Sequence, residues 1–101
     1  MTHSTVVYDA TTAALKAIRT ERERQDQLKA AGRFEHTCAD PEMTDLDCLP
    51  ILGEEYGEVC KALCEKMGLV NDLTKSNLRK ELIQVAAVAT AWIERLDRSS
   101  K

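Results

Sequence analysis

The sequence lacks any long apolar run and carries little excess charge, and each absence excludes a class of protein. No stretch approaches the length of about 20 apolar residues that a bilayer-spanning helix needs, so we expect no membrane segment. The net charge of −3 argues against a nucleic-acid partner, which usually meets a basic face. The N-terminus has no basic region followed by an apolar run, as a secretion signal would. The expected compartment is therefore the cytoplasm.

Aromatic residues are also scarce, at 4% of the chain, whereas Ala, Leu, Glu, Lys and Arg, which favour helices, are abundant. No alternating pattern is long enough for a strand, so we predict an all-α protein. The 101 residues fit one domain, spanning residues 1–101, and 44% apolar content excludes a disordered chain. A domain of this size buries only roughly 60–70% of its unfolded surface. Association between copies is therefore expected.

The four cysteines are Cys38, Cys48, Cys60 and Cys64. Without an export signal, a disulfide framework is not expected. Cys60 and Cys64 are four apart on a predicted helix, which would allow them to share a zinc ion. The spacing to the other two matches no common zinc pattern, and no histidine completes a set. We therefore interpret the thiols as small apolar side chains, buried or half-buried.

Hydrophobic periodicity predicts three helices, over residues 7–31, 47–67 and 75–97. Gly32 and Gly68 are suited to end the first two. Asp47 is predicted to cap the second helix, because a start at Thr44 would place Pro50 too deep for a residue without an N–H. Residues 33–46 lack a clear period and are expected to form an ordered loop.

The predicted helices carry apolar stripes that are expected to face the core. In the second helix the stripe is Leu52, Tyr56, Val59 and Leu63. In the third helix it is close to a coiled-coil seam and consists of Leu78, Leu82, Val85, Ala89, Trp92 and Leu96. Gly53 and Gly57 leave one face of the second helix without side chains, so that another helix can approach it closely.

The stripe of the first helix, which includes Ala17, Ile18 and Leu28, is interrupted by polar residues. Glu21, Arg22 and Gln25 occupy positions where the period predicts apolar side chains. Two interpretations fit this pattern: a polar pocket on the inner face of the helix, or a helix end that projects into water.

Paired polar residues occur on both of the later helices, Glu55 with Glu58 and Glu81 with Gln84. Members of a pair three residues apart lie on neighbouring turns of one face. At 100° per residue, both pairs lie roughly 60–130° to the same rotational side of their apolar stripes. A short connection makes the two helices antiparallel, so equal offsets place both pairs on the same side. We therefore predict that the pairs converge.

Three converging carboxylates and an amide oxygen would need a positive charge among them. All are hard oxygen ligands, which suit Mg²⁺ or Mn²⁺ and not zinc. The alternative is that these are solvated acids on exposed helix faces, where glutamate is common.

A family resemblance adds to this interpretation. The run LGEEYGEV at residues 52–59, followed by ELIQVAAVA at residues 81–89, resembles the MazG-like nucleotide pyrophosphohydrolases, which are all-α nucleoside triphosphate pyrophosphatases. The upstream runs ERERQ at residues 21–25 and CADPEM at residues 38–43 are similar to the short stand-alone members of phages and bacteria. The resemblance extends from about Glu21 to Leu96.

The resemblance implies Mg²⁺-dependent hydrolysis of a nucleoside triphosphate to the monophosphate and pyrophosphate. Mn²⁺ is a possible substitute for Mg²⁺. The implied metal ligands are Glu55, Glu58, Glu81 and Gln84, and Gln84 replaces the aspartate of the family pattern. Glu54 matches an additional acid that would orient or deprotonate water.

The upstream run places Glu21, Arg22 and Gln25 at the substrate, and the sequence offers Arg22, Arg24, Arg79 and Lys80 for its outer phosphates. The implied fold is an antiparallel bundle of three main helices that a homodimer or homotetramer completes into a four-helix-bundle-like arrangement. Two other readings remain open. One is a non-catalytic helical interaction module with a degenerate metal site, and the other is a pyrophosphohydrolase of another nucleotide metabolite.

Overall fold

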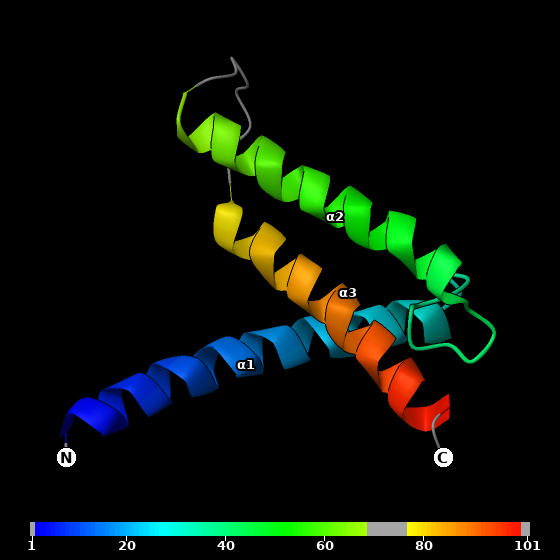
Figure 1. Ribbon diagram of the computed structural model, residues 1–101, viewed down its shortest axis with the longest axis horizontal. Coiled ribbons are helices and arrows are strands. Elements are labelled where there is room, and N and C mark those ends of the chain that lie inside the picture. The colour runs from blue at the N-terminus through cyan, green and yellow to red at the C-terminus, as the bar shows by residue number, and fades with distance from the viewer. Residues whose placement is uncertain (1, 69–76, 100–101) are drawn as a thin grey trace.

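A computed structural model of the chain contains three helices, α1 (Thr2–Ala30), α2 (Asp45–Lys66) and α3 (Leu78–Ser99) (Figure 1). It describes residues 2–68 and 77–99, and their side chains from residue 9 onward. These residues contain no strand, so the predicted all-α class is confirmed. None of the described helices has an apolar stretch long enough to cross a membrane.

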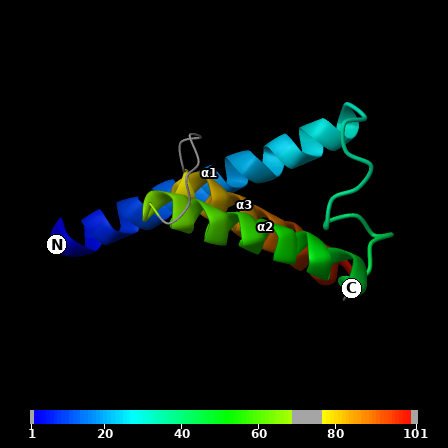
Figure 2. The ribbon, with the colours of Figure 1, turned by 90° about the horizontal axis from the view of Figure 1, so that it is seen from above.

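Helix α3 is the central element. It packs against both α1 and α2, whereas α1 and α2 make no direct packing contact with each other within the described residues. Helices α2 and α3 run antiparallel, as expected, and α1 crosses α3 (Figures 1 and 2). Residues 31–44 connect the C-terminal end of α1 to the start of α2. Within this loop, Cys38 and Ala39 pack in the core. The predicted ordered loop is thus present.

Helix α1 ends at Ala30, one residue before the predicted Ala31 and just before the predicted stop at Gly32, and it begins earlier than the predicted Val7. Gly32 has a φ of +78°, which glycine adopts without a steric penalty. The amide of Arg33 donates to the carbonyl of Leu28 at 2.8 Å, and that of Gly32 donates to Lys29 at 3.0 Å. This paired pattern satisfies carbonyls of the last turn and stops the helix.

The predicted start of α2 at Asp47 is wrong, because Thr44 is the cap. The Thr44 hydroxyl accepts from the Asp47 amide at 3.1 Å, and the Asp47 carboxylate accepts from the Thr44 amide at 2.9 Å. Pro50 therefore lies in the second turn, where the carbonyl of Leu46 loses its helical donor. Leu46 is exposed, so water can take that place, and the reciprocal cap offsets the loss.

Helix α3 begins at Leu78, later than predicted. Asn77 precedes the helix, and its side-chain oxygen accepts from the Lys80 amide at 3.0 Å, as in an N-cap. The predicted start at Lys75 lies outside the described residues, as do the loop residues Asn71 and Asp72.

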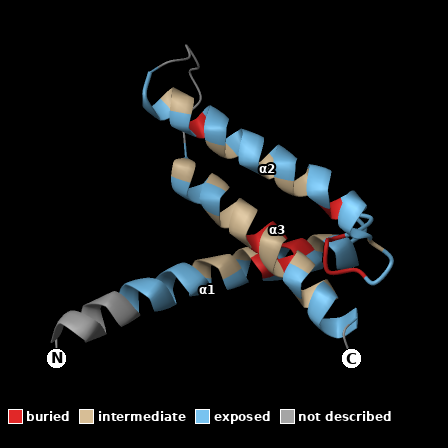
Figure 3. Ribbon diagram, viewed as in Figure 1, coloured by how far each residue is buried: buried red, intermediate tan, exposed pale blue. Residues whose placement is uncertain are grey.

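The fully buried core consists of small side chains, and Leu52 and Trp92 of the predicted stripes are half-buried and pack against it. The buried apolar residues are Cys38, Ala39, Cys48, Ala62, Ala87, Val88 and Ala91. They lie on α3 where it meets α1, on the connecting loop, and near both ends of α2 (Figure 3). The thiols of Cys38 and Cys48 are buried as predicted, whereas Cys60 is exposed. Burial and a hydrogen bond with Cys48 raise the pKa of Cys38 to about 12, so this thiol is unreactive.

Several members of the predicted stripes face outward. Tyr56 and Leu63 on α2 are 64% and 43% exposed, and Leu82 and Leu96 on α3 are 51% and 44% exposed. The reason is that α3 packs against two helices at once. Its small-residue face allows both to approach, and this turns its larger residues away from α1.

Two sets of polar contacts hold the three helices. Nε and Nη2 of Arg22 each donate a hydrogen bond of 2.9 Å to the Glu94 carboxylate, and this contact joins α1 to α3. At the start of α2, Asp45 accepts from Trp92 Nε1 at 2.8 Å and from Arg95. These two hydrogen bonds lower the pKa of Asp45, and they join α2 to the C-terminal half of α3.

Candidate functional site

A pocket of about 220 Å³ lies where α1, the α1–α2 loop, α2 and α3 meet, and we call it the central pocket. Its apolar wall comes from the loop and from the inner faces of α2 and α3. Its polar wall comes from all four segments. The lining residues are Glu21, Arg24, Gln25, Phe34, His36, Thr37, Cys38, Ile51, Glu55, Gln84, Val88 and Ala91. The pocket therefore offers an apolar surface next to carboxylate and amide groups.

Glu55 is the centre of the acidic group at this pocket. It lies on the inner face of α2, between Ile51 and Val59 in the helical repeat, and is half-buried. Burial raises the pKa of Glu55, and so does repulsion from Glu81, Glu54, Glu58 and Glu21. Glu81 on α3 and Glu21 on α1 thus lie near enough to Glu55 on α2 to disfavour its charged form.

Gln84 lies between two of these carboxylates. One terminal atom of its amide lies 3.3 Å from Glu55 Oε2 and 3.0 Å from Glu81 Oε2, and with the nitrogen assigned to that position the amide donates to both. This orientation of the amide follows from its neighbours, because both are acceptors. The two helices therefore bring together Glu55, Glu81 and Gln84, three of the four predicted metal ligands.

Glu58, the fourth predicted ligand, and the predicted catalytic Glu54 lie farther out. Both are exposed, and neither lines the central pocket. Within the described residues, no three of the glutamates bring ligand atoms within 4.8 Å of one another. The donor set still fits a hard cation, because the carboxylate oxygens of Glu55 and Glu81 and the amide oxygen of Gln84 are ligands of the kind that Mg²⁺ and Mn²⁺ prefer.

The polar residues of α1 face inward, which excludes the interpretation that this end of the helix projects into water. Glu21 and Gln25 line the central pocket, and Gln25 is buried. Arg22 is also buried, but it does not line the pocket, because its guanidinium is paired with Glu94 and Asp26. Of the three residues predicted to contact substrate, two are therefore at the pocket.

Arg24 is a basic group that the sequence alone does not single out from its neighbours. Its guanidinium forms a double contact with Glu21, at 2.8 and 2.9 Å, at the pocket. This hydrogen-bonded pair and the nearby Glu55 raise the pKa of Arg24. Arg79 and Lys80, the other predicted phosphate contacts, line a separate groove of about 500 Å³ that shares Glu21 with the central pocket.

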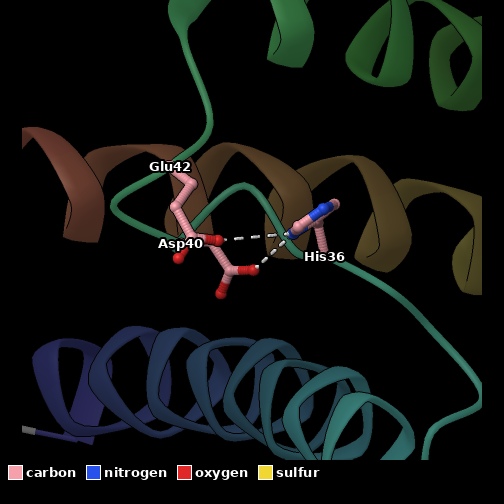
Figure 4. Close-up of side chains that lie close together, drawn as sticks. All are labelled: His36, Asp40 and Glu42. Carbon is pink, nitrogen blue, oxygen red and sulfur yellow. Dashed lines mark hydrogen bonds and ion pairs between the residues drawn. The ribbon is translucent and has the colours of Figure 1, made fainter.

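His36, Asp40 and Glu42 form a further group on the connecting loop that the motifs of the sequence do not indicate (Figure 4). His36 Nδ1 lies 3.1 Å from Asp40 Oδ2 and 3.9 Å from Glu42 Oε2. The spacing of four between His36 and Asp40 is the only sequence signal for it. Asp40 also pairs with Lys29 of α1.

Burial acts to raise the pKa of Asp40, but hydrogen bonds from Lys29 and His36 outweigh it, so the pKa lies below its ordinary value. The ionised Asp40 therefore ties the loop to α1 beside the central pocket. His36, which lines the pocket, is positioned by this contact.

No protein-family model matches this chain, and no curated protein and no solved structure matches it significantly.

Proposed function

We propose that the protein hydrolyses a nucleoside triphosphate to the monophosphate and pyrophosphate with the help of Mg²⁺, as the resemblance to MazG-like pyrophosphohydrolases implies. The observation that carries this proposal is the central pocket, where Glu55 and Gln84, with Glu81 beside them, adjoin an apolar wall. A nucleotide combines a planar apolar base with a phosphate chain that binds metal. The two walls of the pocket match these two parts.

The proposed roles follow from the positions of the side chains. Glu55 and Glu81 would hold the cation, with the Gln84 oxygen and, from outside the pocket, Glu58 as further ligands. The base lies against Phe34, Ile51 and Val88, and Gln25 offers its amide to the polar edge of the base. The cation, when bound, offsets phosphate charge and lowers the pKa of a coordinated water.

The remaining polar groups act on the water and on the outer phosphates. Glu54, exposed and one residue before Glu55, would orient or deprotonate the attacking water from the solvent side. Arg24, at the pocket, would exchange its contact with Glu21 for a phosphate oxygen.

The test is mass spectrometry of the products that the purified protein forms from a mixed nucleotide panel with Mg²⁺ or with EDTA. We expect a monophosphate and pyrophosphate only with the metal. Glu55→Gln should lower the rate by at least about tenfold, since even indirect partners of metal ligands have effects of that size. Glu23→Gln, an exposed change on α1, is the control. Products from a nucleotide-linked metabolite alone would identify the alternative pyrophosphohydrolase.

We further propose that a second copy of the chain covers an apolar surface on α2, which we call the outer seam. The residues of the seam are spaced alternately three and four apart in the sequence, as in coiled-coil interfaces. Its members are Leu46, Leu49, Gly53, Tyr56, Cys60, Leu63 and Met67. All seven are exposed, and its five large side chains are 43–82% exposed. A Cβ placed at Gly53 would meet no atom within 4 Å, so this face has no neighbour in the described chain.

The area of the chain supports the same proposal. It exposes 7651 Å², whereas a folded monomer of 11.3 kDa exposes about 5,700 Å². Two α2–α3 hairpins packed through their outer seams would form a four-helix bundle. If nucleotide hydrolysis is absent, this seam favours the alternative of a helical interaction module.

A further inference from the structure

We propose that Gln84 is a positioning residue that holds the acidic group together in the absence of a cation, by donating from one amide nitrogen to both Glu55 and Glu81. The same amide, rotated by half a turn, offers its oxygen to the cation that the proposed function requires. The inference rests on the proposed metal site only in this second part. The first part concerns the metal-free protein alone.

The geometry places one donor between two acceptors from different helices. Gln84 Nε2 is 3.0 Å from Glu81 Oε2, one turn away on α3, and 3.3 Å from Glu55 Oε2 on α2. Both distances are within hydrogen-bond range or close to its limit. The amide is therefore a link between α2 and α3 at the point where their carboxylates repel each other.

An alternative source of positive charge for this pair is already engaged. The nearby guanidinium of Arg24 bonds both carboxylate oxygens of Glu21. The Gln84 amide group is the group that the structure places in direct contact with Glu55 and Glu81 together. Hydrogen bonds to charged acceptors are stronger than neutral ones, so two of them offset part of the repulsion.

A carboxamide suits both states because it carries a donor and an acceptor at equivalent positions. A half turn about its last bond exchanges the nitrogen and the oxygen and leaves the carbon atoms in place. A carboxylate at residue 84 could bind the cation, but it has no donor and would add a third negative charge to the metal-free site. A leucine at residue 84 could neither donate a hydrogen bond in the metal-free site nor offer an oxygen to the cation.

Gln84→Glu and Gln84→Leu distinguish these states in the full-length chain, without nucleotide. Melting temperature is measured in EDTA and in millimolar Mn²⁺, and Mn²⁺ affinity is measured by titration calorimetry. Gln27→Glu, an exposed glutamine on α1, is the matched control for the added charge. In EDTA we expect both Gln84 variants to melt about 5–10 °C below the wild type, because two hydrogen bonds are lost.

With Mn²⁺ the two variants should separate. Gln84→Glu should bind Mn²⁺ about tenfold more tightly than the wild type and recover its melting temperature, because it adds a charged ligand. Gln84→Leu should bind Mn²⁺ more weakly and stay low. If both variants melt with the wild type in EDTA, the bridging role is overturned. If the wild type binds no Mn²⁺, the metal site and the proposed role of the amide as a metal ligand fail. The melting temperatures of the variants and the wild type in EDTA still decide whether the amide bridges Glu55 and Glu81.

Discussion

Arg22 is a charged side chain that is only 5% exposed, at the junction of α1 and α3. Its hydrogen bonds with Glu94 raise its pKa against the opposing effect of burial, and Asp26 adds to the increase. A buried charge is tolerated when it is fully paired. Removing one partner destabilises the fold, because the other charge is then left without compensation. This arrangement makes Arg22 a structural link between the helices beside the pocket.

Arg22→Ala should lower the free energy of unfolding by about 2–3 kcal/mol, less than for a fully buried pair because Glu94 is partly exposed. The melting temperature should fall by about 10 °C or more. The measurement is urea unfolding followed by circular dichroism. Arg19→Ala is the control, because its pair with Glu23 on the same helix is exposed on both sides and should contribute below about 0.5 kcal/mol. Equal losses for the two variants would contradict the assignment of Arg22 as the link.

Asp40 should make the stability of the loop depend on pH. Its pKa in the folded protein lies below the unfolded value of about 3.9. Its contribution is therefore complete above that value and is lost as the pH falls through the folded pKa. Asp40→Asn should be less stable than the wild type by about 2 kcal/mol at pH 7, from the loss of charged hydrogen bonds.

The check on Asp40 is the difference in unfolding free energy between wild type and variant at pH 7, 5 and 3. We expect the difference to narrow as the pH falls below about 3.9, because the carboxylate of the unfolded chain takes up a proton before that of the folded chain. Asp9→Asn, an exposed carboxylate on α1, should show almost no difference at any of the three pH values. A gap for Asp40→Asn that stays constant with pH would show that packing, and not charge, is responsible.

At the level of elements, the sequence predicts the features that depend on neighbouring residues in the chain, such as helix ends and the faces of helices. Gly32 and Gly68 end α1 and α2 because both adopt positive φ, and the equal offsets of the two acidic pairs bring Glu55 and Glu81 together. The sequence does not reveal which face of a helix packs against another helix, because this depends on the tertiary arrangement. The stripes on α2 and α3 are strong periodic signals, but a helix that packs on two sides uses its small residues for contact. Periodicity does not distinguish such a face from an interface with another copy.

The start of α2 shows a conflict between two local rules. The cost of Pro50 within a helix predicts a start at Asp47, but the reciprocal cap formed by Thr44 and Asp47 stabilises the earlier start. The additional turn also carries Asp45, which bonds Trp92 and Arg95 of α3. Tertiary contacts therefore favour the longer helix.

Thr44→Ala should remove the cap and lower the free energy of unfolding by about 1 kcal/mol. Thr44→Ser keeps an oxygen at the same place and should be close to the wild type, so it is the matched control. Chemical denaturation of the three proteins measures both effects. If Ser and Ala were equally destabilising, the methyl group of Thr44 and not its hydroxyl would be the important part.

On the scale of the whole molecule, the described chain has its pocket and its largest apolar surface in different places. The central pocket lies on the inner face of α2, among Ile51, Glu55 and the loop. The outer seam lies about a third of a turn around the same helix. The radius of gyration is 15.9 Å, compared with about 12.7 Å for a compact domain of this length. The chain is thus less compact than a typical domain of its length, and a partner copy on the seam would cover a face of α2 other than the one that lines the pocket.

Leu63→Glu should disrupt the proposed dimer without changing the fold of the separate chain. Leu63 belongs to the outer seam and is 43% exposed, so a charge is tolerated in a monomer but would be buried without a partner in the dimer. Sedimentation at micromolar concentration should give the mass of two or four chains for the wild type and of one chain for the variant. Leu15→Glu is the matched control, because Leu15 is 60% exposed on α1 and lies outside the seam. This control should keep the wild-type mass. A monomeric wild type would contradict the proposal, and so would a Leu63→Glu protein that sediments with the wild type.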